Sequence, residues 1–178
     1  MKIYFVRHAQ TTANKNQLIE GHTNGEITQE GITQAQTAAD KIKKTHFEAA
    51  YTSDLTRCTQ TAAIILAHHK LFAITDSRLR GRNYGPYEHK PVGSIDWDEE
   101  GNTFEDENSY SSRVKEFINE ITHKHTKNVL VITHGGVIRR TLHQYCKKKQ
   151  EEAMKTDIPN ASVLVVDTQK NTCSHITH

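Results

Sequence analysis

The sequence has few cysteines and prolines and no long apolar run. Its 178 residues include three cysteines, three prolines and one tryptophan. Cys58, Cys146 and Cys173 are too few and too widely spaced for a disulfide framework or a CxxC metal or redox site, so we expect free thiols and a cytoplasmic protein. No stretch approaches the roughly 18 consecutive apolar residues of a membrane span. The apolar run at residues 2–6 is too short for a signal peptide and is typical of a buried strand.

The sequence also lacks an excess of charge of either sign. Lys and Arg number 23 and Asp and Glu number 21, which gives a formal net charge of +2. Such a balance argues against nucleic acid or a membrane as a partner. The length predicts a single domain over residues 1–178. No long apolar surface stripe is evident, so we expect a monomer.

Histidine is unusually frequent. The twelve histidines lie at positions 8, 22, 46, 68, 69, 89, 123, 125, 134, 143, 175 and 178. Histidine is a common metal ligand and a common acid–base residue, so the count alone suggests either a metal site or acid–base chemistry. Position along the chain must decide between them.

Strand-like and helix-like segments alternate along the chain. Strands are predicted at residues 2–6, 47–51, 71–75, 128–133, 162–166 and 172–176. Helices are predicted at residues 28–45, 53–66 and 135–145, with Thr28 capping the first and Ser53-Asp54 the second. This alternation predicts an α/β fold with three layers, α/β/α, around a mainly parallel sheet. The pattern breaks at about residues 85–112, which we interpret as a small insertion above the sheet.

Unusual polar residues follow three of the predicted strands. Arg7-His8 follows the first strand, and His134-Gly135-Gly136 follows the strand at 128–133. Arg57 lies in the first turn of the helix that comes after the second strand. Ligands of parallel sheets bind beyond the carboxyl ends of the strands. If these strands are parallel, two histidines and two arginines meet at one edge of the sheet.

The charge of this cluster favours phosphate over metal. Two guanidiniums repel a cation and bind a dianion through the hydrogen bonds that they donate, so we expect no metal and no cofactor. A neutral imidazole beside a bound phosphoryl group can attack phosphorus, while the arginines stabilise its oxygens and a second histidine donates a hydrogen bond. This predicts metal-free phosphoryl transfer from a small phosphorylated substrate. Taken singly, each residue also has an ordinary interpretation: a surface Arg-His pair, a solvated helix arginine, or a tight His-Gly-Gly turn.

Several longer motifs carry a resemblance to a known family. They are Arg-His-Ala-Gln-Thr at 7–11, Ile-Thr-x-x-Gly-x-x-Gln-Ala at 27–35, Ser-x-Leu-x-Arg-x-x-Gln-Thr-Ala at 53–62, Val-Ile-Thr-His-Gly-Gly at 131–136 and Pro-Asn-Ala-Ser-Val at 159–163. With these motifs the chain resembles the histidine phosphatase superfamily, which has the phosphoglycerate mutase-like fold, and within it the phosphatase branch.

The resemblance implies a role for individual residues. His8 would be the nucleophile that becomes phosphohistidine, and Arg7, Arg57 and His134 would surround the phosphoryl group. The residues implied for substrate binding are Asn14, Gly21, Arg82, Tyr84 and Gly135.

One departure from the family pattern concerns the general acid. The family usually carries Leu-x-Glu-x-x-x-Gly before the insertion, whereas this chain has Gly81 in place of the glutamate. Protonation of a leaving group is worth roughly 10²–10⁴-fold in rate. Glu88, Asp76 and Glu20 are candidates for a replacement acid, although each is also readily interpreted as a surface carboxylate.

The missing acid leaves several functions open. The first is a metal-independent phosphatase acting through phosphohistidine, with activity reduced by Gly81. The alternatives are a pseudoenzyme that binds phosphorylated ligands, a phosphohistidine phosphatase and a phosphoglycerate mutase-like enzyme. The short chain and small insertion argue against the mutase.

Overall fold

A six-stranded sheet forms the centre of the molecule. The computed structural model describes residues 1–95 and 103–176. The strands are β1 (Lys2–Arg7), β2 (Ala49–Thr52), β3 (Ala73–Thr75), β4 (Val129–Thr133), β5 (Val163–Asp167) and β6 (Thr172–His175). They are arranged in the order β3-β2-β4-β1-β5-β6, with the first four parallel and the last two antiparallel to their neighbours. The predicted α/β class with a mainly parallel sheet is therefore confirmed.

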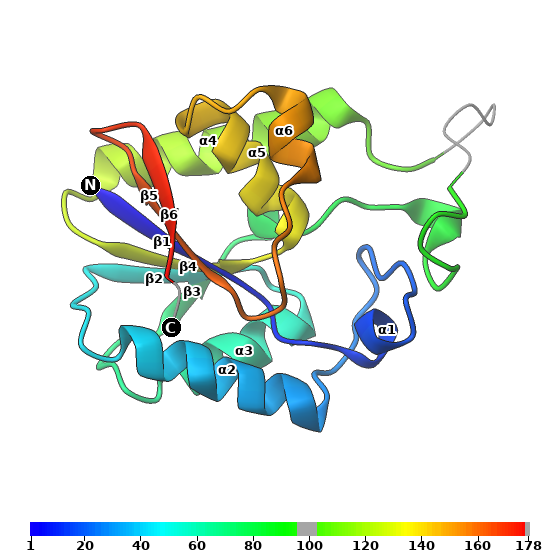
Figure 1. The fold of residues 1–178 in the computed structure, drawn as a ribbon, viewed down its shortest axis with the longest axis horizontal. Coiled ribbons are helices and arrows are strands. Elements are labelled where there is room, and N and C mark those ends of the chain that lie inside the picture. The colour runs from blue at the N-terminus through cyan, green and yellow to red at the C-terminus, as the bar shows by residue number, and fades with distance from the viewer. Residues whose placement is uncertain (96–102, 177–178) are drawn as a thin grey trace.

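Helices cover both faces of this sheet. They are α1 (Thr12–Lys15), α2 (Gln29–Ile42), α3 (Thr56–Leu66), α4 (Glu107–Lys124), α5 (Gly135–Tyr145) and α6 (Gln150–Lys155), with short 3-10 helices at Ser77–Leu79 and Gly85–Tyr87. Figure 1 shows α2 and α3 on one side of the sheet and α4, α5 and α6 on the other. The three-layer arrangement expected from the alternating pattern is present.

The central strand β4 explains how the layers are held together. All five of its residues are buried. Val129 and Val131 pack with α4 and α5, whereas Leu130 and Ile132 pack with α2 and α3. Because successive side chains of a strand point to opposite faces, one continuous apolar run supplies two separate cores.

The N-terminus of one predicted helix is capped by a side chain, as expected, and that of another is not. Thr28 caps α2 as expected, because its hydroxyl accepts a hydrogen bond from the Gly31 amide at 3.0 Å. In contrast, α3 begins after Leu55 and has no side-chain cap, so the predicted Ser53-Asp54 cap is wrong. The hydroxyl of Ser53 lies instead 3.1 Å from the His134 ring, and Asp54 pairs with Arg80.

The predicted insertion is shorter than expected. Helix α4 begins at Glu107, inside the predicted range 85–112, and Asp106 caps it by accepting hydrogen bonds from two backbone amides. Tyr110 and Val114 are part of the core, so the start of α4 belongs to the sheet-covering layer. Most of the acidic run at 96–107 that marked the insertion lies outside the described residues.

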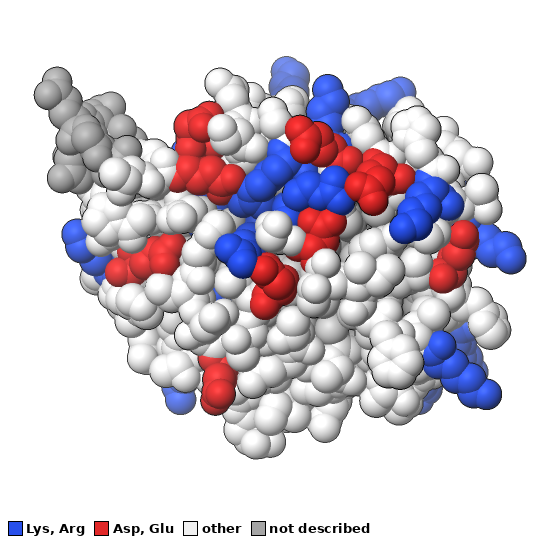
Figure 2. All heavy atoms as spheres, turned by 180° about the vertical axis from the view of Figure 1, so that it is seen from behind, with Lys and Arg blue, Asp and Glu red and all other residues white. Residues whose placement is uncertain are grey.

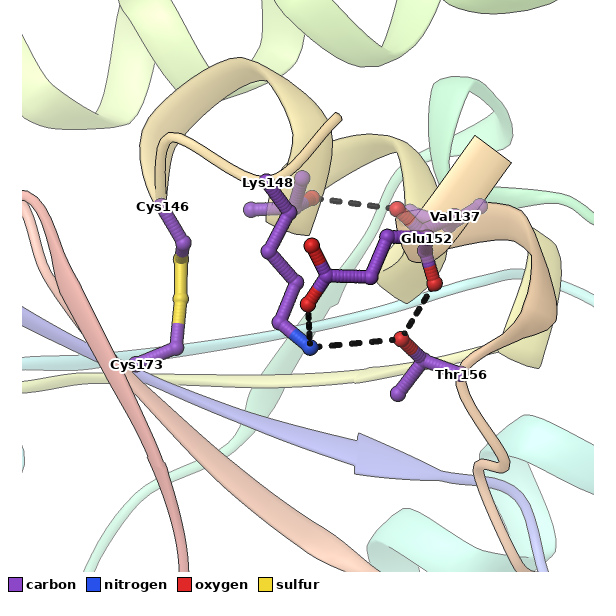
Figure 3. Close-up of a disulfide and its surroundings, with 7 residues drawn as sticks. Val137, Cys146, Lys148, Glu152, Thr156 and Cys173 are labelled. Carbon is purple, nitrogen blue, oxygen red and sulfur yellow. Dashed lines mark hydrogen bonds and ion pairs between the residues drawn. A yellow bond between two sulfur atoms is a disulfide. The ribbon is translucent and has the colours of Figure 1, made fainter. Parts of the chain in front are cut away.

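The expectation of three free thiols is wrong for two of them. Cys146, which ends α5, and Cys173 on β6 form a disulfide, with their Cα atoms 5.8 Å apart (Figure 3). Their separation of 27 positions hides this proximity in the sequence, because α6 and β5 lie between them and return the chain to the end of α5. Cys58 is free and buried. The cytoplasmic location loses part of its support and stays a prediction.

The surface mixes charges of both signs. Figure 2 shows basic and acidic side chains lying next to one another on the face opposite to that of Figure 1. Arg78, for example, pairs with both Asp76 and Glu120, at 2.6 and 2.7 Å. Within the described ranges, none of the helices is both long and apolar enough to cross a membrane.

Candidate active site

The carboxyl ends of two adjacent parallel strands, β1 and β4, bring His8 and His134 together. Pairing of β1 with β4 sets Arg7 opposite Thr133, so the residues that follow, His8 and His134, leave the sheet side by side. The His8 amide donates to the Thr133 carbonyl at 2.8 Å, and the two imidazole centroids lie 5.1 Å apart. The register of a parallel sheet thus creates the cluster expected from the sequence.

A cavity of about 500 Å³ opens beside these histidines. The ten residues predicted to bind or act on the phosphoryl group and substrate, or to mark the acid position, all line it: Arg7, His8, Asn14, Gly21, Arg57, Gly81, Arg82, Tyr84, His134 and Gly135. Its lining also includes residues that were not predicted as site residues: Ile19, Val92, Gly93, Ile95, Tyr110, Gly136 and Arg139. Glu20, which was named only as a candidate acid, lines it as well.

His8 is held as a neutral imidazole with one nitrogen available. Its Nδ1 lies 2.9 Å from the carbonyl oxygen of Ala9. A carbonyl only accepts, so Nδ1 carries the proton and Nε2 keeps its lone pair. Burial lowers the pKa of His8 well below its usual value, and the nearby guanidiniums of Arg57 and Arg7 lower it further. The side chain is therefore suited to act as a nucleophile at neutral pH.

The two arginines are fixed by backbone carbonyls. Arg57 is 2% exposed and donates to the carbonyls of Thr23 and Gly21 at 2.8 and 2.7 Å. Arg7 donates through Nη1 to the Ile158 carbonyl at 2.6 Å, while its buried Nε has no hydrogen-bond partner among the described residues. Burial lowers the pKa of Arg7, and the charge of Arg139 adds to this. An anion in the cavity would relieve this crowding of positive charge.

Both ring nitrogens of His134 engage protein groups. A guanidinium can only donate, so Nδ1 accepts from Arg57 Nη2 at 3.3 Å and Nε2 carries the proton. Nε2 lies 3.1 Å from the Ser53 hydroxyl and 3.4 Å from Cys58 Sγ. The hydrogen bond that His134 was expected to give a phosphoryl group is thus directed elsewhere, and the ring would have to turn to make it. Burial also lowers the pKa of His134 well below its usual value, which keeps it neutral.

The loop at Gly21 is tied to the segment that follows position 81. Gly21 has a φ of +53°, and a Cβ there would lie 2.0 Å from the Glu88 carboxylate, so a larger residue would be strained and would displace that carboxylate. Glu88 accepts hydrogen bonds from the amides of His22 (2.7 Å), Thr23 (3.1 Å) and Tyr84 (3.3 Å). This carboxylate holds two loops together and does not line the cavity, which makes it unsuitable as a replacement acid.

Position 81 faces His134. An ideal Cβ on Gly81 would lie 3.3 Å from His134 Cγ, so a side chain at this position would enter the cavity beside the imidazole. The Gly81 carbonyl accepts from Arg113 Nη2 at 2.8 Å and lies 2.9 Å from His22 Nε2. A side chain at position 81 would therefore reach the cavity at the place where the family pattern predicts a glutamate and this chain has glycine.

The other two candidate acids have different surroundings. Asp76 caps the 3-10 helix at Ser77–Leu79 and forms an ion pair with Arg78, away from the cavity lining. Glu20 is buried, receives a hydrogen bond from the Thr11 hydroxyl at 3.1 Å and lies 3.4 Å from Arg57 Nε. Burial raises the pKa of Glu20.

The remaining substrate-side residues are held by neighbours. Asn14 accepts from the Asn160 side chain at 2.9 Å. Arg82 donates through Nε to the Glu105 carbonyl at 2.6 Å and packs against the Phe104 ring. No three His, Cys, Asp or Glu side chains within residues 1–95 and 103–176 gather closely enough to hold a metal ion.

Comparison with known proteins agrees with the geometry. The family model of the histidine phosphatase superfamily (branch 1) matches residues 3–177. The chain is 30% identical to the broad-specificity phosphatase YOR283W of Saccharomyces cerevisiae, over 96% of this chain and 81% of that protein.

Two solved structures share the fold at lower identity. The alpha-ribazole phosphatase of Shigella flexneri is 23% identical, with a TM-score of 0.86 over 98% of this chain and 94% of that one. A phosphoglycerate mutase of Bacillus anthracis is also 23% identical, with a TM-score of 0.83 over 100% and 92%. With the motifs, the fold and the family model in agreement, the chain belongs to the histidine phosphatase superfamily, branch 1.

Proposed function

We propose that the protein is a metal-independent phosphatase that hydrolyses phosphate monoesters through a phosphohistidine on His8. The observation that carries this is the state of His8: a buried, neutral imidazole with Nδ1 bonded to a carbonyl and Nε2 unprotonated, in a cavity lined by Arg7 and Arg57. The similarity of the chain to a broad-specificity phosphatase of yeast supports hydrolysis as the reaction.

The reaction proceeds in two steps. Nε2 of His8 attacks phosphorus, the N–P bond forms, and the P–O bond to the leaving group breaks. Water then attacks phosphorus, a P–O bond forms as the N–P bond breaks, and inorganic phosphate leaves; the proton that the water releases replaces the one that the leaving group takes up. Arg7, Arg57 and the amide of Gly135 at the start of α5 stabilise the equatorial oxygens in both steps. His134, after its ring turns, donates to the same oxygens.

The rest of the cavity contacts the organic part of the substrate. Asn14 and Gly21 line one side, and Arg82 and Tyr84 line another. Arg82 and Arg139 add positive charge, so the substrate is a small phosphorylated molecule. We expect the segment after Tyr84 to determine which one.

Gly81 favours substrates whose leaving group needs no proton. Without an acid at this position, aryl phosphates and phosphohistidine are better substrates than alkyl phosphates. Phosphohistidine phosphatase activity is therefore the second candidate function. If turnover is lost altogether, the same cavity serves a pseudoenzyme that binds phosphorylated ligands.

The test compares two leaving groups with and without chelation. We expect p-nitrophenyl phosphate to be hydrolysed faster than ethyl phosphate, with rates unchanged by EDTA, and an acid-labile, alkali-stable phosphoenzyme to be trapped. Inhibition by EDTA that zinc reverses would contradict the metal-independent reaction. Vanadate binding without turnover of either ester would favour the pseudoenzyme.

We also propose that the protein is cytoplasmic and monomeric, without nucleic-acid or membrane partners. The mixed surface charges support this. The exposed apolar side chains of Phe72 and Ile74, beside and in the edge strand β3, are the surface at which a second copy could pair (94% and 52% exposed). Sedimentation of the purified protein therefore tests whether it is a monomer.

A further inference from the structure

Tyr110 brings a hydroxyl without a partner to the catalytic cavity. It lies in the first turns of α4, is 1% exposed, and lines the cavity together with Gly81 and His134. Its buried Oη has no hydrogen-bond partner among the described residues. A buried hydroxyl is normally hydrogen-bonded, so an unpaired one in a substrate cavity suggests that the substrate supplies the partner.

The hydroxyl lies close to the start of α5. An ideal Cβ on Gly136 would be 2.6 Å from Tyr110 Oη, a distance at which no side chain fits. Gly136 follows His134 by two residues, so its lack of a side chain makes room for the hydroxyl beside the catalytic segment. The N-terminus of α5, which has no side-chain cap, lies at the same place.

The same ring is connected to the vacant acid position. The guanidinium of Arg113 lies 4.4 Å from the centroid of the Tyr110 ring and donates to the Gly81 carbonyl at 2.8 Å. The tyrosine therefore lies between the segment that carries Gly81 and the helix that begins after His134.

Two cations lie against the ring. Besides Arg113, the guanidinium of Arg140 lies 3.7 Å from the ring centroid. Glu105 and Glu107 pair with these arginines, which fixes the guanidiniums in place. Burial raises the pKa of Tyr110, so the hydroxyl is protonated at neutral pH, and the arginines oppose this shift by favouring the phenolate. A phenolate formed during a reaction would thus be stabilised where it forms.

We propose that Tyr110 is the proton donor to the leaving group, acting in the space that Gly81 leaves free; this rests on the proposed phosphatase function. As the N–P bond to His8 forms and the P–O bond breaks, the phenolic proton moves to the leaving oxygen, and a phenolate remains beside Arg113 and Arg140. In the second step, the attacking water gives its proton to the phenolate as the N–P bond breaks. Phosphate leaves and the hydroxyl is restored.

Glu20 is the competing donor, and its contacts argue against it. Oε2 is engaged by the Thr11 hydroxyl and Arg57 Nε, whereas Oε1 is buried close to Gly25 and has no hydrogen-bond partner among the described residues. Proton transfer from Glu20 would leave a negatively charged carboxylate beside Arg57, which would weaken the attraction of that arginine for the phosphoryl group. Its contacts suit a residue that positions Arg57.

The experiment measures kcat/KM for p-nitrophenyl, phenyl and ethyl phosphate in wild type, Tyr110→Phe and the matched control Tyr145→Phe. The Tyr145 hydroxyl donates to Asn119 at 2.8 Å, outside the catalytic cavity. Phenylalanine keeps the ring and its two cations, and removing an unpaired hydroxyl should not lower the melting temperature. We expect Tyr110→Phe to lower the ratio of ethyl to p-nitrophenyl phosphate turnover at least about tenfold, with Tyr145→Phe matching wild type.

Each other result has a distinct meaning. An unchanged ratio in Tyr110→Phe overturns the proposal, as does a wild type that turns over p-nitrophenyl phosphate alone. A ratio that falls in Glu20→Gln and stays constant in Tyr110→Phe also overturns it and assigns the proton to Glu20. Failure of the wild type with all three esters, with no phosphohistidine trapped, overturns both the proposed function and the role of Tyr110.

Discussion

In the proposed reaction, the cavity beside His8 has a phosphoryl half (Arg7, His8, Arg57 and His134) and a leaving-group half (Gly81, Arg82, Tyr84 and Tyr110). In the phosphoryl half, Arg7 ends β1, the two histidines follow β1 and β4, and Arg57 lies in the first turn of α3. Main-chain carbonyls hold both arginines. The leaving-group half is built from coil and from α4, and side-chain ion pairs hold its arginine neighbours. If the proposed reaction holds, the sheet positions the groups that act at phosphorus, whereas the surrounding segments determine what the leaving group contacts.

The largest expected effect breaks the phosphoryl half. His8→Ala removes the nucleophile, so turnover of both aryl and alkyl phosphates should fall by roughly 10³-fold or more and the phosphoenzyme should disappear. Trapping labelled phosphate on wild type and variant checks this. A variant that retains the label would contradict the assignment of the nucleophile.

A smaller effect is expected from Arg57→Lys. Lysine keeps the charge but cannot reach Gly21, Thr23 and the phosphoryl oxygens with a planar fork, so kcat/KM should fall by about 10²-fold. The loss should be the same for p-nitrophenyl and ethyl phosphate, because Arg57 belongs to the phosphoryl half. A loss confined to ethyl phosphate would show that the two halves are not separate.

Gly81→Glu should improve the leaving-group half. A carboxylic acid beside His134 is a stronger proton donor than the Tyr110 phenol, so the variant should raise kcat/KM for ethyl phosphate at least about tenfold and change that for p-nitrophenyl phosphate much less. The His134 ring must yield by a few tenths of an ångström, since the new Cβ would lie 3.3 Å from Cγ. Gly81→Gln is the control of equal size. An equal gain in both variants would indicate a packing effect rather than proton donation.

The smallest expected effect is on the pH dependence of stability. The pKa values of His8 and His134 are lowered well below 6.5, so between pH 6.5 and 5 the unfolded chain takes up protons that the folded one does not. The free energy of unfolding should therefore fall as the pH falls, by up to about 1.4 kcal/mol per pH unit for each histidine.

His8→Asn isolates one of these two contributions. Urea unfolding at pH 6.5 and 5 should show that the free energy of unfolding falls less in the variant than in wild type, because the contribution of His8 is missing. Some loss remains, because His134 and the half-buried His69 contribute in both proteins. Identical losses in the two proteins would show that His8 takes up its proton in the folded state.

The two halves also differ in how far the sequence predicted them. Arg7, His8 and His134 could be placed together because each follows an apolar run, and register alone aligns the ends of parallel strands. The sequence also identified Gly81 by its place in a motif. The turn of the His134 ring toward Arg57 and Ser53 depends on side-chain packing and has no counterpart in spacing.

The unpredicted features are those that join distant segments. Tyr110 lies in a stretch interpreted as an insertion, since Asp106 capping and the apolar spacing of α4 were not recognised there. The Cys146–Cys173 disulfide brings together residues that a count of spacings leaves apart. Glu88 is the candidate acid nearest to Gly81 in the sequence, yet its carboxylate accepts hydrogen bonds from three backbone amides.

The place of β1 in the sheet has a consequence for biosynthesis. This strand, which leads directly to His8, pairs with β4 on one side and β5 on the other (Figure 1). A ribosome therefore makes the strand that carries the nucleophile long before either of its neighbours, residues 129–133 and 163–167, has emerged. The apolar residues of β1 must wait for those neighbours, and a nascent chain that stops short of β5 carries His8 without a complete sheet to hold it.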